Sequence, residues 1–362
     1  MAAPADSFEF LRTGKKLRNR AVVAAMTNKQ SNEDGSLSDE EINWLLRRAD
    51  GGFGIVTTAA SHVVREGKGW DGEMGVWGDH QLQGLTRLAE GIRERGAVSL
   101  GQIFHGGMRC PQGLTGVQPV SASVNPTSDS DTGETRALED SEIEELVEAF
   151  AAAAARCEKA GFDGVEIHGA HGYLICQFLG LQTNRREDRW GGPLENRARF
   201  LLNIIERIRQ VTSEDFLLGV RISPEYNNIG VMLEDSLDLV DMLVKSGIDY
   251  LHISCWDCFT PPTHYDDPRM LTEIFAERLA NRLPMISCGA VWSTAQAQQV
   301  MDQGADLVAV ARSAIGHADW ASNLGDLDSD PQRPPFTTAH LESQGLSPKF
   351  VEYMRAWKGF IA

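Results

Sequence analysis

The sequence lacks the features that mark several large classes of protein. Among its 362 residues no apolar run reaches the roughly 18 residues that a membrane-spanning helix needs. Six cysteines are too few for a disulfide scaffold, so we expect free thiols in a reduced compartment. Lysine and arginine number 34 against 51 acidic residues, a formal net charge of −17. That charge argues against binding to nucleic acid or to an anionic membrane surface.

The remaining composition is that of a globular protein with a large core. Hydrophobic residues make up 42% of the chain and charged residues 23%. Asp6 and Glu9 lie where a signal peptide would be apolar, so we expect a cytoplasmic protein. Length alone predicts roughly two domains of about 150 residues, although an α/β barrel often runs to about 250 residues as one domain.

Short β-rich runs alternate with helical stretches along the chain. The predicted strands are 20–26, 53–60, 97–104, 164–169, 217–223, 250–254, 284–289 and 307–312. Helices are predicted after Ser38 and after Ser141, each with a glutamate three residues later as in a capping box, and over 196–211, 233–246 and 293–302. Eight such units predict a single-domain (β/α)8 TIM barrel over residues 1–325, and a doubly wound sheet is the alternative. Residues 326–362 are expected to form a tail that packs on or near the barrel.

Three predicted strands are followed by long loops, 60–79, 105–139 and 174–196, which belong at the C-terminal face where barrel active sites form. His168 and His171 end the fourth strand, with Tyr173 just beyond. Two imidazoles can be metal ligands, can donate hydrogen bonds to a substrate oxygen, or can be a structural pair. Tyrosine, with a pKa of about 10, can supply a proton.

Other polar residues also fall at predicted strand ends. Gln102 ends the third strand, and its amide both donates and accepts, which suits a pyrimidine-like ring. Arg221 ends the fifth strand and must face an anion or an internal ion pair. Gly289 and Arg312 end the seventh and eighth strands, where many barrels bind phosphate. In isolation, a bond to a neighbouring loop or an internal salt bridge would also explain Gln102 and Arg221.

The run EIHGAHGYLICQFLGLQTNRREDRWGGPLENRARF, residues 166–200, resembles the Old Yellow Enzyme family of FMN-dependent NADH:flavin oxidoreductases. It contains the family's H-x-x-H-x-Y, followed by N-x-R-x-D-x-[YW]-G-G-x-x-E-N-R-x-R-F. The runs NRAVVAAMT (19–27), Q-x-x-H-x-G (102–107) and ADLVAVAR (305–312) fit in the same order, so the resemblance covers nearly the whole chain. The charged residues of the second half of this motif are expected to hold the loop after the fourth strand in place.

The resemblance implies an ene-reductase that holds FMN without a covalent bond. Gln102 would bind the flavin pyrimidine, Arg221 would face flavin N1, and Thr27 would bind flavin O4. Ala25, Met26 and Thr58 would line the isoalloxazine ring, and Gly289, Ala311 and Arg312 would surround the phosphate. His168 and His171 would bind the carbonyl or nitro oxygen of an activated alkene. Flavin N5 would give hydride to its β-carbon, and Tyr173 would protonate its α-carbon.

The sequence departs from the family pattern at Ala25, often a proline, at Lys29, a tyrosine in some members, and at Met108, which interrupts the usual H-x-G-R. These departures concern substrate preference. The chain is expected to take electrons directly from NADH or NADPH, without choosing between them, and a homo-oligomer is left open. Two alternatives stay open: a metal-dependent hydrolase with His168 and His171 as ligands, and a flavoprotein without alkene reduction.

Overall fold

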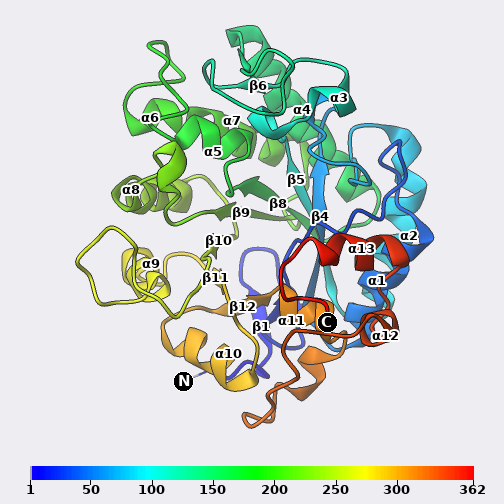
Figure 1. Cartoon of the computed structure of the whole chain (residues 1–362). Coiled ribbons are helices and arrows are strands. Elements are labelled where there is room, and N and C mark those ends of the chain that lie inside the picture. The colour runs from blue at the N-terminus through cyan, green and yellow to red at the C-terminus, as the bar shows by residue number, and fades with distance from the viewer. Residues whose placement is uncertain (1) are drawn as a thin grey trace.

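The computed structural model describes residues 2–362 and contains a closed barrel of eight parallel strands (Figure 1). In order around the barrel these are β3 (Ala21–Val23), β4 (Ile55–His62), β5 (Val98–Phe104), β8 (Gly164–Gly169), β9 (Leu217–Ile222), β10 (Tyr250–Ser254), β11 (Met285–Cys288) and β12 (Leu307–Val310). Pairing of β12 with β3 closes the barrel. The predicted (β/α)8 fold is confirmed, and the doubly wound alternative is wrong.

The barrel strands read as apolar runs because they are buried on both faces, as parallel strands between helices are. All eight residues of β4 and all seven of β5 are buried. The first barrel strand is shorter than predicted. It ends at Val23, which pairs with the last residue of β12, Val310. Ala25 and Met26, which were predicted in the strand, therefore lie with Thr27 in the loop at the C-terminal face.

Helices surround the barrel, with α1 (Asp39–Asp50), α2 (Leu82–Glu94), α4 (Asp140–Lys159), α7 (Arg199–Val211), α8 (Leu233–Lys245), α9 (Leu271–Leu279) and α10 (Thr294–Asp302) following successive strands. The predicted cap of α1 is confirmed, since the Ser38 side chain accepts a hydrogen bond from the Glu41 N–H at 3.1 Å. The predicted start of α4 at Ser141 is wrong. The N-cap is Glu139, two residues before Ser141, because Glu142 accepts a hydrogen bond from the Glu139 N–H at 2.8 Å and caps the helix there.

An antiparallel pair that the sequence did not predict, β1 (Phe8–Phe10) and β2 (Lys15–Leu17), packs against the inner layer of the barrel. The Phe10 ring centroid lies 5.8 Å from that of Tyr250, and both residues belong to an apolar cluster with Val22 and Leu100. This pair precedes β3 and covers the N-terminal ends of the strands. Ligands can therefore enter the barrel only at the C-terminal ends of the strands.

The loop after β8 is fixed by its own charged residues. It carries the short helices α5 (Leu174–Leu179) and α6 (Leu194–Arg197). Arg186 pairs with Asp188 at 2.6 Å and also donates to backbone carbonyls of the preceding long loop. Arg197, almost fully buried, pairs with Asp235 at 2.8 Å. These contacts agree with the expectation that the charged residues in this half of the motif hold the loop in place.

The C-terminal segment forms α12 (Thr338–Ser343) and α13 (Pro348–Arg355), drawn in red beside α1 in Figure 1. Phe350 packs edge-on against Trp44 with ring centroids 5.3 Å apart, and the Arg48 guanidinium donates to the Gln344 carbonyl at 2.9 Å. Tyr353, one turn further along α13, has its ring centroid 5.3 Å from the Lys29 ammonium. This contact brings the tail to the loop that follows β3. None of the helices formed by residues 2–362 is both long and apolar enough to cross a membrane.

Candidate active site

Three aromatic side chains meet where β8 ends. The His168 and His171 ring centroids are 4.9 Å apart, and those of His168 and Tyr173 are 5.1 Å apart. His171, with φ of +59°, and Gly172, with φ of +74°, form a left-handed turn between the strand and α5. That turn brings His171 and Tyr173 back over the strand end. The turn thus brings the two histidines and the tyrosine of the H-x-x-H-x-Y motif together at one corner of the barrel mouth.

Both histidines are neutral in the fold, because burial lowers the pKa of each well below the usual range of imidazole. A neutral imidazole has one N–H donor and one acceptor nitrogen. The Ala170 N–H donates to Nδ1 of His168 at 3.4 Å. We therefore assign the His168 proton to Nε2, which is left to donate to a ligand.

Ser254, the last residue of β10, holds the second histidine. Its Oγ lies 2.7 Å from Nε2 of His171 and 3.0 Å from Nη2 of Arg221. The arginine can only donate, so the serine oxygen accepts from it, and we assign the serine's own proton to Nε2 of His171. The proton of His171 is then on Nδ1. The two imidazoles offer opposite nitrogens, each as an N–H donor.

Tyr173 lies in a small apolar cluster with Ala60, Phe104 and Trp70, separate from the barrel core. Its ring centroid is 5.0 Å from that of Phe104 in an edge-to-face arrangement. Burial raises the pKa of Tyr173 to about 12, although Arg109 nearby opposes the shift. The phenol therefore stays protonated at neutral pH and can serve as a proton donor.

A metal site at these histidines is not supported by the side chains around them. Within residues 2–362 no group of three or more His, Cys, Asp or Glu side chains could hold a metal ion. Zinc in proteins takes at least three protein ligands. The histidine pair thus lacks the further ligands that the metal-dependent hydrolase hypothesis requires.

Arg221 provides an observation that fits an anionic ligand. The residue is 5% exposed, and its Nη1 and Nη2 donate to the Ala25 carbonyl at 3.3 Å and to Ser254. Its Nε is buried and has no partner among residues 2–362. Nη2 also lies 3.4 Å from the Cys288 sulfur; burial raises the pKa of that thiol, but Arg221 and His252 lower it to about 6. A cation at this position fits the N1 side of a flavin, which is negative when reduced.

Gln102 is oriented by a buried ion pair deeper in the barrel. Its Nε2 donates to Oε1 of Glu166 at 2.7 Å, and Oε2 of Glu166 lies 2.8 Å from Nδ1 of His252. Burial opposes charge on both partners, but their mutual attraction lowers the pKa of Glu166 and raises that of His252. The amide of Gln102 is therefore held in one orientation, as recognition of a pyrimidine ring requires.

The ends of β11 and β12 present a backbone suited to phosphate. Gly289 has φ of +148°, and a Cβ there would lie 2.5 Å from the Cys255 carbonyl oxygen, so only glycine fits. Ala311 and Arg312 begin α11 (Arg312–Gly316), whose first N–H groups have no partner within the helix. The Arg312 side chain is exposed. Together with Arg221 and Gln102, this donor set fits FMN.

The remaining predicted flavin contacts lie near this face, with one reservation for Thr58. Ala25, Met26 and Thr27 are half-buried in the loop after β3. Thr58 is fully buried, and its Oγ1 donates to the Ala59 carbonyl at 2.8 Å and accepts from the Gln102 N–H at 3.0 Å. Both of these hydrogen bonds are made within the barrel strands. Contact between Thr58 and the isoalloxazine ring therefore stays a prediction.

Three residues near the site were not recognised from the sequence. Ser254 and Cys288 end β10 and β11, and a rule that every polar residue at a barrel strand end is a candidate would have found both. Arg109 follows the Met108 that interrupts the H-x-G-R pattern. Its guanidinium carbon lies 4.5 Å from the Tyr173 ring centroid. The arginine is shifted by one position in the sequence but lies at the site.

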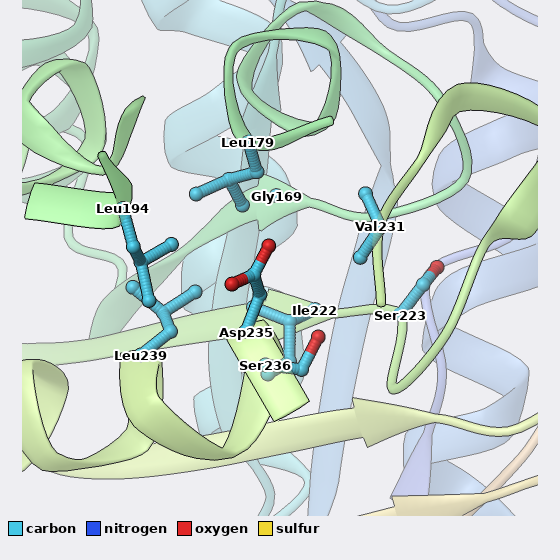
Figure 2. A pocket seen from close by; sticks show the side chains of 9 residues that line it. All are labelled: Gly169, Leu179, Leu194, Ile222, Ser223, Val231, Asp235, Ser236 and Leu239. Atoms are coloured by element: carbon cyan, nitrogen blue, oxygen red, sulfur yellow. The ribbon is translucent and has the colours of Figure 1, made fainter. Parts of the chain in front are cut away.

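A small cavity lies beside the site rather than in it. It is lined by residues at the ends of β8 and β9, on α8 and in the loops after β8 and β9: Gly169, Leu179, Leu194, Ile222, Ser223, Val231, Asp235, Ser236 and Leu239 (Figure 2). Its volume of about 10 Å³ leaves room for about one water molecule. This cavity is too small for a cofactor or a substrate.

Comparison with known proteins agrees with this geometry. The model of the NADH:flavin oxidoreductase / NADH oxidase family matches residues 8–326. A Bacillus subtilis (strain 168) protein, "Probable NADH-dependent flavin oxidoreductase YqiG", is 39% identical over 87% of this chain and 86% of its own length. The NADH:fumarate oxidoreductase of Klebsiella pneumoniae (strain 342) is 35% identical over 87% of this chain. The match covers only 35% of that longer protein.

A solved structure covers the fold from end to end. The old yellow enzyme homologue from Zymomonas mobilis superposes with a TM-score of 0.81 at 26% identity. The match includes 96% of this chain and 98% of that one. Sequence and structure thus indicate the same group of proteins.

Proposed function

Because the chain belongs to the NADH:flavin oxidoreductase / NADH oxidase family and is an oxidoreductase of Old Yellow Enzyme type, we propose that it is an ene-reductase. Its cofactors are FMN and a nicotinamide, NADH or NADPH. Its substrate is an alkene activated by a carbonyl or nitro group. FMN, when bound, would supply the hydride transfer from the nicotinamide to the alkene β-carbon.

The observation that carries this proposal is the corner formed by His168, His171 and Tyr173. Addition of hydride to the β-carbon of an enone leaves negative charge on the carbonyl oxygen. Two neutral imidazole N–H groups, Nε2 of His168 and Nδ1 of His171, can both donate to that oxygen. Because they are fixed before the substrate binds, they stabilise the charge without reorganisation.

Tyr173 completes the reaction by protonating the α-carbon. Its ring lies edge-on to His168 with centroids 5.1 Å apart, so a small alkene held at the histidines also lies near its hydroxyl. The phenol, with a pKa of about 12, is protonated at neutral pH, and solvent returns the proton afterwards. Arg221, Gln102, Gly289 and Arg312 hold the FMN. The net change adds one hydride and one proton across the double bond.

The visible spectrum of the purified protein tests the proposal. A yellow protein should bleach on anaerobic addition of NADH or NADPH and should recover its colour when cyclohexenone is added. Chromatography should then detect cyclohexanone in an amount equal to the flavin reoxidised. A protein that bleaches and is reoxidised only by oxygen would instead be a flavoprotein without alkene reduction.

A further inference from the structure

Arg109 is a cation of the active-site face whose charge has no acidic partner. Its Nη1 donates to the backbone carbonyl of His171 at 2.9 Å, and its guanidinium carbon lies 4.5 Å from the Tyr173 ring centroid. The side chain is exposed. Among residues 2–362 no carboxylate forms an ion pair with Arg109. The guanidinium therefore keeps donors free beside the residues that would bind the substrate.

Glu73, the carboxyl group that acts on Tyr173, does not neutralise the charge of Arg109. Glu73 acts on Tyr173 but is fully buried, with Oε1 2.7 Å from Nδ1 of His62 and Oε2 accepting from the Gly69 N–H at 2.8 Å. Burial raises its pKa well above the usual range of a carboxyl group. In a chain of net charge −17, an arginine without a carboxylate at this position is available for an anionic ligand.

We propose that Arg109 binds a carboxylate of the substrate, so that the alkenes this enzyme prefers carry an acid group in addition to the activating carbonyl. This inference rests on the ene-reductase function proposed above. The activating oxygen would lie at His168 and His171, and the carboxylate would lie beside the Tyr173 ring, at the guanidinium. A planar guanidinium with two parallel N–H groups matches a carboxylate in both charge and shape.

The location of Arg109 explains why such an acid would be selected rather than merely tolerated. The guanidinium lies over the face of Tyr173, beside an apolar cluster of Trp70, Phe104 and Ala60. The Tyr173 ring covers one face of the guanidinium, and the remaining N–H groups of this exposed side chain are open to an incoming carboxylate. A short unsaturated oxo acid places a carbonyl and a carboxylate at opposite ends of one double bond, which fits both sets of donors.

The test compares (E)-4-oxopent-2-enoate with its methyl ester, which keeps the alkene and the ketone but removes the negative charge. The holoenzyme should show a preference for the acid, expressed as the ratio of the two kcat/KM values. Arg109→Gln should lower this ratio by about 10- to 100-fold, the range for loss of a charged hydrogen bond. Arg109→Lys, which keeps the charge but not the planar fork, should give an intermediate ratio.

A matched control is available at Arg65. This arginine is also exposed and lies over an aromatic ring, with its guanidinium carbon 5.5 Å from the Trp77 ring centroid. It faces a groove against α4, which is formed with Ala149 and Arg156. Arg65→Gln should leave the ratio unchanged.

Binding without turnover gives a second readout. Calorimetric titration with 4-oxopentanoate, the saturated acid, should show weaker binding to the Arg109→Gln holoenzyme than to the wild type, and its methyl ester should not discriminate between them. Reduction of both alkenes with no effect of Arg109→Gln on the ratio would overturn the carboxylate site and leave the ene-reductase function intact. A slower reduction of the flavin by NADH in Arg109→Gln, with the ratio unchanged, would assign the arginine to the nicotinamide and also overturn it. Reduction of neither alkene would instead overturn the ene-reductase function.

Discussion

The hydroxyl of Ser254 lies 2.7 Å from Nε2 of His171, and this contact joins two parts of the site that the sequence keeps 83 residues apart. The same hydroxyl accepts from Arg221 at 3.0 Å. Ser254 thus lies between the arginine expected at the flavin and the histidine expected at the substrate oxygen. With the serine proton assigned to Nε2 of His171, the imidazole proton is on Nδ1, which can donate.

Ser254→Ala should slow alkene reduction by about 10-fold, because loss of one hydrogen bond of about 1.4 kcal/mol frees His171 to adopt the other tautomer. Flavin reduction by NADH should slow less, since it develops no charge on an oxygen held by His171. Stopped-flow absorbance of the two half-reactions measures both rates. Ser287→Ala removes another buried barrel hydroxyl, one that bonds Thr272 at 2.8 Å, and serves as the control. Equal slowing of both half-reactions in Ser254→Ala would argue against a role through His171.

Tyr173→Phe should slow alkene reduction by about 100-fold or more, the range for loss of a general acid, and should leave flavin reduction by NADH nearly unchanged. In the wild type, this step should not lose rate with rising pH until the pH approaches the Tyr173 pKa of about 12. Rapid mixing of the reduced enzyme with cyclohexenone over a pH series measures both effects. Tyr265→Phe, which removes a hydroxyl that donates to Glu234 at 2.5 Å, is the matched control. A rate that falls near neutral pH would point to a different proton donor.

Gly289→Ala should lower the amount of FMN that purifies with the protein. The new Cβ would lie 2.5 Å from the Cys255 carbonyl oxygen, and φ of +148° is unfavourable for alanine, so the backbone must shift where the phosphate is expected. The ratio of flavin absorbance to protein absorbance after gel filtration measures the loss. Gly325→Ala, where a Cβ would meet nothing within 4 Å, should retain its flavin. Full flavin content in Gly289→Ala would remove this glycine from the proposed phosphate site.

His168→Asn should weaken the dependence of stability on pH. His168 stays neutral in the fold because its pKa lies well below the ordinary 6.5, whereas the unfolded chain binds a proton there below pH 6.5. Unfolding therefore becomes more favourable as the pH falls, by about 1.4 kcal/mol per pH unit for each such histidine. Urea denaturation between pH 5 and pH 6 should show a slope smaller by about that amount in the variant. The exposed His264→Asn is the control, and an unchanged slope in His168→Asn would show that His168 is charged in the fold.

Much of the fold could be predicted because parallel barrel strands are buried on both faces and read as short apolar runs. The strands at 164–169 and 250–254 were predicted with their observed bounds, β8 and β10. Other strand ends could not be predicted from local pattern, since the length of β3 depends on its partner β12, where Val310 pairs with Val23 from 287 residues further along the chain. The pair β1–β2 was missed because three-residue strands carry too little pattern.

For the site, the sequence determined which residues lie at strand ends and therefore on one face. It placed His168, His171, Tyr173, Gln102 and Arg221 on the C-terminal face without any tertiary information. The rule is local: a parallel strand ends at the same face as its neighbours. The family followed from one long motif.

Only the tertiary structure decided what those residues touch. The tautomer assigned to His171 depends on Ser254, the orientation of Gln102 depends on Glu166 and His252, and the position of Arg109 over Tyr173 depends on its bond to the His171 carbonyl. Hydrogen bonds act over about 3 Å and have no counterpart in sequence spacing. The sequence by itself therefore determined the barrel and the cofactor, and it predicts the face on which the cofactor binds. The directions of the donors, which control the chemistry on that face, come from contacts between distant strands.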